Sequence, residues 1–167
     1  MSDELNLSID TSGAEITGMT AQLDEVDWQL LYELQHDARH GFRELGRRVS
    51  LSAPAVAARI RRLERLGVIT GYHAHLDPER AGYAAQAFVV VTTPGRRASV
   101  TVAGLAADNP RILEDHRITG TDDHLLRVVS PTLSGLEPVI DTLNEHGKPA
   151  TSVVLSTPKP WAPLPPP

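Results

Sequence analysis

Apolar residues recur at helical spacing in three consecutive segments of the first half of the chain. The first segment follows Asp24, a good helix-capping residue, and should end near Asp37. A shorter helix is expected at about 42–49. The third begins after Ser52, which can cap it, and stops at Gly67. Its inward-facing apolar positions are Val56, Ile60 and Leu63. The second and third segments are joined by a short turn and preceded by the first helix. This pattern predicts a helix-turn-helix domain that is winged-helix-like.

The second half of the chain alternates between strand-like and helix-like patterns. The expected elements are strands at 85–93, 112–119, 124–130 and 150–157 and helices at 97–107 and 133–143. Pro138 favours a later start for the second of these helices, with Ser134 and Glu137 as a capping box. The order strand, helix, strand, strand, helix, strand predicts a ferredoxin-like βαββαβ domain, so the fold class is α+β.

These patterns divide the chain into five parts. They are an extension at 1–22, a helix-turn-helix domain at 23–70, a linker strand at 71–84, a ferredoxin-like domain at 85–157 and a proline-rich tail at 158–167. The tail holds six prolines in ten residues and is expected to be extended or disordered. We expect it to be exposed to solvent, with docking of Trp161 in a polyproline ligand as the alternative. No long apolar run or secretory signal is present, which predicts a cytoplasmic protein that does not cross a membrane.

Charge is distributed unevenly along the chain, whose formal net charge is -5. Residues 1–38 hold nine acidic residues and no lysine or arginine. Residues 39–65 hold eight arginines against two glutamates and no lysine. Such a local basic block is typical of proteins that read nucleic acid, because phosphate binding depends on the local field. The planar guanidinium also suits phosphates and guanine edges.

The third helix places small residues and arginines on the face opposite its apolar stripe. Outward alanines would let the backbone approach base edges, and arginines would contact bases and phosphates in the major groove. The residues expected at a double-stranded DNA interface are Ser52, Pro54, Ala55, Ala58, Arg59, Arg61 and Arg62. A solvated or partner-binding helix face is the alternative. It would make the chain a protein-binding module with a ferredoxin-like assembly domain rather than a DNA reader.

Other chemistry has weaker support in the sequence. The chain contains no cysteine, so disulfides, thiolate nucleophiles and cysteine-ligated zinc are excluded. His73 and His75 could bind a metal, but no third ligand is identifiable nearby, and we expect exposed strand or linker histidines and no metal or cofactor. An acid/base set could be drawn from Asp122, Asp123 and His124. Because neighbouring strand residues point to opposite faces and no nucleophile motif accompanies them, we expect no enzyme.

Several short motifs together resemble the Lrp/AsnC family of feast/famine transcriptional regulators. They are Leu23-Asp24-x-x-Asp27, the Leu51-Ser52 turn, Arg59-Ile60-Arg61-Arg62-Leu63-Glu64, Gly67-Val68-Ile69-x-Gly71-Tyr72 and Gly120-x-x-Asp123. The similarity covers about residues 23–157. It implies a regulator that binds DNA as dimers, assembles into octamers or open helical arrays through its second domain, and commonly responds to an amino acid.

The resemblance also implies a position for the effector. In this family the effector lies near a turn that corresponds here to Gly120, Thr121, Asp123 and His124. Thr121 and His124 depart from residues common in the family, so the identity of the effector does not carry over. The same turn residues also suit a hairpin for conformational reasons alone. Ser50 stands where the family usually has glycine, and a left-handed backbone there would be strained.

Overall fold

The structure, a computed structural model, describes residues 22–167, so the predicted extension lies almost entirely outside it. The chain forms two compact units. Of the described residues, the helix unit contains 22–73 together with Ala162–Pro167, and the sheet unit contains Ala74–Trp161. None of the helices in the described part has the length and apolar character required to cross a membrane.

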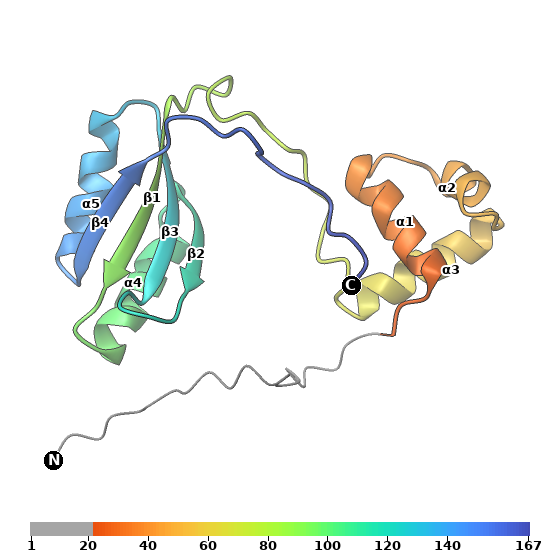
Figure 1. Cartoon of the computed structure of the whole chain (residues 1–167), viewed down its shortest axis with the longest axis horizontal. Helices are drawn as coiled ribbons and strands as arrows, with labels where there is room; N and C mark the ends of the chain where they lie inside the picture. Colours follow the sequence, from red (N-terminus) through yellow and green to blue (C-terminus); the bar gives the residue numbers. More distant parts are fainter. Residues whose placement is uncertain (1–21) are drawn as a thin grey trace, which may run out of the picture. The chain divides into compact units, whose positions relative to one another are not determined.

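The helix unit consists of α1 (Glu25–His36), α2 (Phe42–Arg48) and α3 (Ala53–Arg65), as Figure 1 shows. The predicted boundaries at Asp24, Asp37 and Ser52 are confirmed, because these residues are the N-cap of α1, the C-cap of α1 and the N-cap of α3. The apolar stripes of the three helices meet in one core. Its buried members are Leu30, Leu45, Val49, Val56 and Ile60.

The turn between α2 and α3 is tight. The N–H of Leu51 donates to the carbonyl oxygen of Gly46 at 2.8 Å. A Cβ at Gly46 would lie 2.3 Å from the oxygen of Leu51, so only glycine fits there. Ser50 has a φ of 56°, the left-handed region that glycine adopts without a steric penalty. The strain expected at this serine is therefore present.

The sheet unit has the predicted order of elements. They are β1 (Ala85–Thr92), α4 (Arg96–Asp108), β2 (Ile112–Arg117), β3 (His124–Ser130), α5 (Glu137–Asn144) and β4 (Lys148–Val153). The strands lie in the order β2-β3-β1-β4, and every neighbouring pair is antiparallel. This arrangement confirms the ferredoxin-like prediction.

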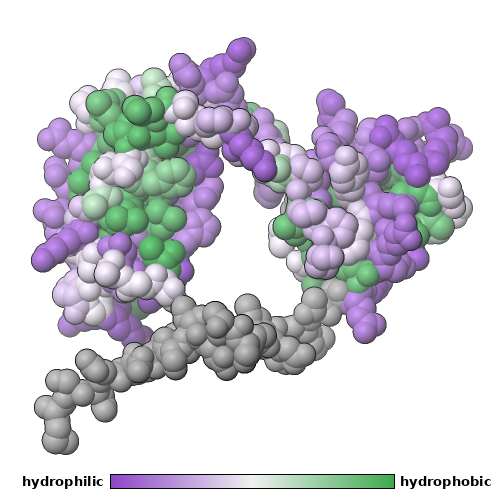
Figure 2. Space-filling model, viewed as in Figure 1, coloured by the Kyte–Doolittle hydropathy of each residue, from purple (hydrophilic) through white to green (hydrophobic). Residues whose placement is uncertain are grey.

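Helices α4 and α5 cover one face of this sheet (Figure 1). Alternate residues of β1 from Ala85 to Val91 are buried and pack with Val102 of α4 and Leu143 of α5. The other face carries Phe88, which is 42% exposed, and the partly exposed Val90. Figure 2 shows hydrophobic residues gathered over the strands on the visible side of this unit. One sheet face thus forms the core, while no helix in the described part of the chain covers the apolar side chains of the other face.

The prediction of a linker strand is wrong. The linker segment 71–84 forms no strand, and no strand precedes β1 in the described chain. A strand needs a neighbouring strand to pair with its backbone N–H and C=O groups. In segment 71–84 the backbone hydrogen bonds instead close a local turn, such as the one from the Ala81 N–H to the Asp77 carbonyl at 3.0 Å. The helix unit consequently contains no strand among its described residues, so the winged-helix-like detail is not found there.

The start of the second helix of the sheet unit also differs in detail. α5 does start late, at Glu137, with Pro138 in its first turn as predicted. However, no side chain caps it, so the Ser134–Glu137 capping box is wrong. A short 3₁₀ helix, η1 (Ser134–Leu136), leads into α5 instead and supplies the preceding turn.

The strain at Ser50 yields a stability prediction. Ser50→Gly should raise the free energy of unfolding by up to about 1 kcal/mol, because relief of the left-handed strain outweighs the extra entropy of an unfolded glycine. Chemical denaturation of the full chain measures this change. Ser50→Ala keeps the Cβ and serves as the control, which should show no gain. Equal stability of Ser50→Gly and Ser50→Ala would contradict the strain argument.

Candidate nucleic-acid interface

Helix α3 presents the face that the sequence predicted to be outward. The Ser52 hydroxyl oxygen accepts a hydrogen bond from the N–H of Ala55 at 3.4 Å, and Pro54 lies in the first turn, where no N–H is needed. Ser52, Pro54, Ala58 and Arg61 are exposed, and Ala55 is half-buried. The inner residues Val56, Ile60 and Leu63 are buried. The two-sided character predicted for this helix is confirmed.

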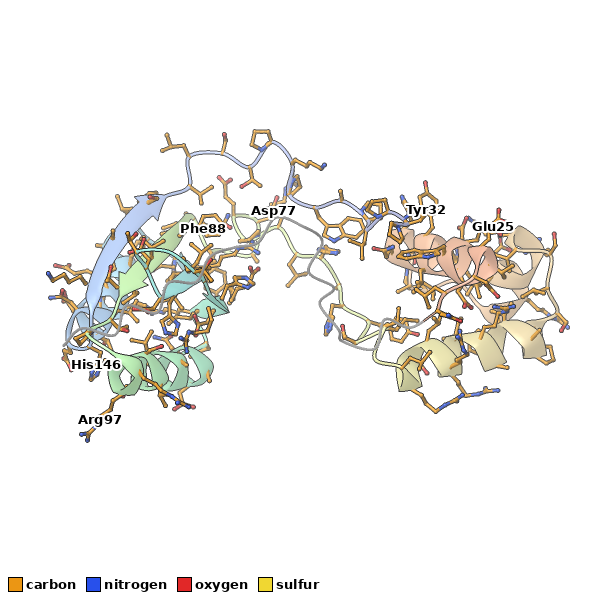
Figure 3. The ribbon with its side chains drawn as sticks, turned by 60° about the horizontal axis from the view of Figure 1, so that its bottom comes forward. Glu25, Tyr32, Asp77, Phe88, Arg97 and His146 are labelled. Atoms are coloured by element: carbon orange, nitrogen blue, oxygen red, sulfur yellow. The ribbon has the colours of Figure 1, made fainter. Side chains whose placement is uncertain are left out.

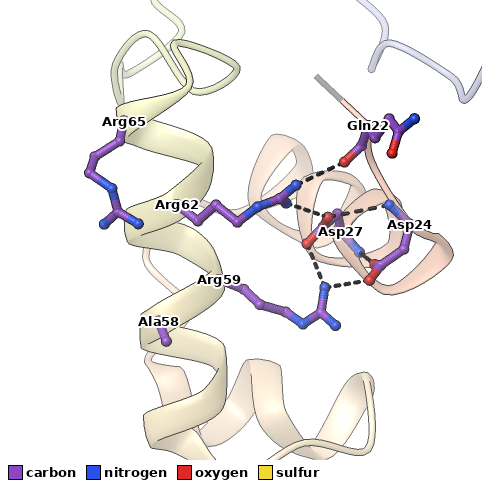
Figure 4. Close-up of a pocket in the computed structure, with 7 residues that line it drawn as sticks. All are labelled: Gln22, Asp24, Asp27, Ala58, Arg59, Arg62 and Arg65. Atoms are coloured by element: carbon purple, nitrogen blue, oxygen red, sulfur yellow. Dashed lines mark hydrogen bonds and ion pairs between the residues drawn. The ribbon is translucent and has the colours of Figure 1, made fainter. Parts of the chain in front are cut away.

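Arg59 and Arg62 do not extend freely from this face, because both reach the buried carboxylate of Asp27 on α1 (Figure 4). The Arg59 guanidinium lies 2.8 Å from one oxygen of Asp27, and that of Arg62 lies 2.9 Å from the other. Asp27 is only 1% exposed. Arg62 also donates to the backbone oxygen of Gln22 at 2.9 Å. One carboxylate therefore fixes two arginines of α3.

Asp24 completes this cluster at the start of α1. Its side chain accepts the Asp27 N–H at 2.8 Å and the Arg59 guanidinium at 2.7 Å. The Asp27 N–H lowers the pKa of Asp24 from its ordinary value, and Arg59 lowers it further. A depressed pKa means that the ionised cap is present at neutral pH and is lost only as the pH falls through the lowered value. The cluster lines a shallow hollow with Ala58 and Arg65.

The arginines of the basic block thus fall into two groups. Arg39, Arg47, Arg48, Arg59 and Arg62 each form an ion pair with an aspartate or glutamate. Arg43, Arg61 and Arg65 have no acidic partner among residues 22–167 and are exposed. In Figure 4 the side chain of Arg65 points away from Asp27, whereas Arg59 and Arg62 point toward it. Among the described residues, these three guanidinium groups are the ones that no carboxylate contacts.

The contribution of Asp27 was not predicted from the sequence. The motif Leu23-Asp24-x-x-Asp27 was visible, and its spacing is that of a capping box, which the structure contains. The capping spacing does not reveal that the second aspartate also reaches two arginines, which lie 32 and 35 residues further along the chain. Charge complementarity between the acidic start of the chain and the basic block was the only available signal.

The predicted effector turn lies between β2 and β3. Gly120 has a φ of 123° and is exposed, as is Thr121. The Asp123 carboxylate accepts the N–H and the hydroxyl of Thr93, at 2.6 and 2.7 Å. The hydroxyl of Thr93 lowers the pKa of Asp123 below its ordinary value, and its N–H lowers it further. Asp123 therefore holds the turn against the end of β1, a structural role that the sequence left open.

His124 is fully buried. Its Nδ1 lies 2.8 Å from an oxygen of Asp115, and its Nε2 lies 2.8 Å from the hydroxyl oxygen of Ser99. The three groups have the order of a Ser-His-Asp relay, but Ser99 is only 2% exposed and no substrate could reach its hydroxyl. The network instead links α4 to β2 and β3, directly behind the turn. Of the four predicted effector residues, Gly120 and Thr121 are the two that face outward.

Comparison with known proteins places both units in one family. The family model of the AsnC-type helix-turn-helix domain matches residues 23–64, and that of the Lrp/AsnC ligand-binding domain matches residues 86–164. The transcriptional regulator YezC of Bacillus subtilis is 40% identical over 135 residues, which cover 81% of this chain and 95% of that protein. The proline dehydrogenase transcriptional activator of Rhodobacter capsulatus is 40% identical over 67% of this chain and 74% of its own length.

Solved structures agree with the sequence comparison. LrpC of Bacillus subtilis superposes with a TM-score of 0.77 at 27% identity, covering 84% of this chain and 99% of LrpC. A regulator of Neisseria meningitidis in complex with L-Met superposes with a TM-score of 0.80 at 32% identity, covering 86% and 97% of the two chains. The helix-turn-helix and ligand-binding units, in this order and over most of the chain, show that the protein belongs to the Lrp/AsnC family of transcriptional regulators.

Proposed function

We propose that this transcriptional regulator reads double-stranded DNA by inserting the outer face of α3 into the major groove. The observation that carries the proposal is that Arg61 and Arg65 are exposed, have no acidic partner among residues 22–167, and lie beside the small exposed residue Ala58. Small side chains allow close approach, and guanidinium groups can contact guanine edges and phosphates. Ser52, Pro54 and Ala55 at the start of the helix belong to the same surface.

In this proposal Arg59 and Arg62 contribute in a different way. Asp27 and Asp24 neutralise much of their charge and hold the guanidinium groups at defined positions. Guanidinium N–H groups that do not bond to these carboxylates remain available for a phosphate or a base. We infer that the acidic pair pre-positions these two arginines, which lowers the entropy cost of ordering them on DNA.

The arginine assignment predicts a loss of DNA affinity for Arg61→Ala. If Arg61 contacts a base, the loss should be about 1–3 kcal/mol at one operator position, while the fold is unaffected because no described residue pairs with Arg61. Fluorescence anisotropy with a duplex selected by binding from genomic DNA measures the affinity. Arg97→Ala on α4, whose side chain extends from the sheet unit (Figure 3), is the matched control and should bind normally.

Arg59→Ala and Arg62→Ala test the pre-positioned pair in the same assay. Both should weaken DNA binding, and Asp27→Asn should weaken it less, because the arginines remain but are no longer fixed. Wild-type affinity in both arginine variants would remove Arg59 and Arg62 from the interface and leave Arg61 and Arg65 as its basic residues.

We also propose that the sheet unit assembles the protein into homodimers and, from these, octamers or larger arrays. The open face of the sheet supports this, since Phe88, Val90 and Leu125 lie on it and no helix of residues 22–167 covers them. Exposed apolar patches on a sheet commonly mark interfaces. A dimer would also present two α3 helices, as the two halves of a palindromic site require.

Assembly through this face can be disrupted at its centre. Phe88→Lys places a second cation opposite Arg127, its partner in the β1–β3 register, and should shift the protein toward monomers. Light scattering at micromolar concentration measures the mass. Val100→Lys replaces an exposed apolar residue of α4 and should leave the wild-type assembly intact. A monomeric wild-type protein would refute the proposed assembly.

The effector proposal concerns the turn at 120–124. The match to a ligand-binding domain and the similarity to a regulator solved with L-Met support an amino acid as effector. Gly120 exposes its backbone and Thr121 its hydroxyl, so the turn offers polar groups to an ammonium and a carboxylate. In this proposal Asp123 and His124 do not contact the effector but hold the turn in place, through their bonds to Thr93 at the end of β1 and to Ser99 of α4.

Isothermal calorimetry against the twenty amino acids tests this site. The wild type should bind at least one of them, and Asp123→Ala should lose that binding because the turn is no longer held to Thr93. DNA binding without effector should stay within a few fold of wild type. Asp141→Ala removes an exposed carboxylate from α5 and is the control. Undiminished binding by Asp123→Ala would place the effector elsewhere.

A further inference from the structure

The C-terminal tail returns to the helix unit. After β4 the chain continues without helix or strand, and Ala162–Pro167 belongs to the same compact unit as α1, α2 and α3. Within residues 163–167, Leu164 alone is not a proline and therefore alone carries a backbone N–H. This single N–H is a specific point at which the tail can be held.

Gln35 of α1 bonds to both backbone groups of Leu164. The Leu164 N–H donates to the side-chain oxygen of Gln35 at 2.7 Å, and the side-chain amide of Gln35 donates to the Leu164 carbonyl at 3.3 Å. A side-chain amide that meets an N–H and a C=O of the same residue reproduces the pairing of a sheet. The two hydrogen bonds with Gln35 thus set both the position of Leu164 on α1 and the direction in which the tail runs past it.

Aromatic side chains of α1 form the groove beside this contact. Leu164 and Pro166 line it together with Trp28, Tyr32 and Val49. Trp28 and Tyr32 lie one helical turn apart and so share a face of α1, and Figure 3 shows Tyr32 and Glu25 along this helix. Aromatic grooves are the usual receptors for polyproline segments, whose stiff backbone loses little entropy on binding.

The groove lies on a different face of α1 from the contact with α3. The groove residues are Glu25, Trp28, Gln29, Tyr32 and Glu33. The residues that pack inward or reach the arginines of α3 are Asp27, Leu30 and Leu31. A docked tail therefore does not cover Arg61 or Arg65, and occupation of the groove is compatible with DNA binding by α3.

A second contact joins the two segments that connect the units. Trp161, immediately before the docked residues, packs against His75 with ring centroids 5.0 Å apart. His75 lies at the start of the other connection, just after the helix unit ends at His73. The tail and the linker therefore contact each other before the tail reaches α1.

We propose that the aromatic groove of α1 is a binding site for a polyproline segment and that its ligand is this chain's own tail. The docked tail acts as a strap, a second connection between the helix unit and the sheet unit beside the linker. The proposal does not rest on the DNA-binding role of α3, and it would hold or fail independently of it.

Disulfide trapping in the full chain tests the docking, because the protein contains no cysteine and any introduced pair is unique. Gln29→Cys combined with Pro166→Cys places both thiols in the groove. On mild oxidation this variant should form an intrachain disulfide at monomer mass on a non-reducing denaturing gel, with the bond identified by mass spectrometry. Arg43→Cys with Pro166→Cys, whose first cysteine lies on α2 outside the groove, is the control and should react much more slowly.

Two further substitutions test whether Gln35 and Leu164 hold the tail. Gln35→Ala and, separately, Leu164→Pro should each slow the trapping reaction about fivefold or more, as the loss of a hydrogen bond implies. Circular dichroism checks that the helices persist. Trapping at dimer mass would show that the groove takes the tail of a second copy and would overturn the strap. Trapping no faster than the control would overturn docking altogether.

Discussion

The proposed DNA-binding surface of α3 depends on the ion pairs that the buried carboxylate of Asp27 forms with Arg59 and Arg62. Asp27 lies at the start of α1, caps that helix together with Asp24, and bonds to two arginines of α3. A buried carboxylate is costly unless cations and donors compensate it, and here two guanidinium groups do so. The same contact therefore fixes α1 against α3 and leaves Arg61 and Arg65 as the arginines of α3 without a carboxylate partner among the described residues. The orientation of α3 and the distribution of its unpaired charges thus both depend on Asp27.

Ion pairing of this kind reduces the net positive charge that the arginines of residues 39–65 present at the surface. Counted along the sequence, eight arginines within 27 residues suggest a strong positive surface. In the folded helix unit most of them are balanced by carboxylates of α1 and α2, and three remain unpaired among the described residues. Reading of DNA would then rely on a few well-placed guanidinium groups rather than on a general field, which favours specificity over non-specific binding.

Local sequence signals predicted most of the helices and strands. Features that depend on contacts between residues far apart in the sequence were not predicted. Ser52, Pro54 and Gly67 mark the ends of α3 by their own chemistry, so its boundaries could be read from the sequence. The linker strand failed because a strand depends on a partner that no local pattern reveals. His124 was placed in an effector site, although it shares the alternation of Leu126 and Val128, both buried, which could have indicated its burial. The docking of Leu164 on Gln35 joins residues 129 apart and had no local signal beyond proline content.

The salt dependence of DNA binding tests the central claim most directly. If Arg43, Arg61 and Arg65 neutralise phosphates, the logarithm of the binding constant should fall linearly with the logarithm of salt concentration, by about 0.9 for each phosphate contacted. The Arg61→Ala variant should reduce the slope by about one unit per bound chain if Arg61 contacts a phosphate, and leave it nearly unchanged with weaker binding if it contacts a base. Binding that is insensitive to salt, or a triple alanine variant at these positions with the wild-type slope and affinity, would contradict the account.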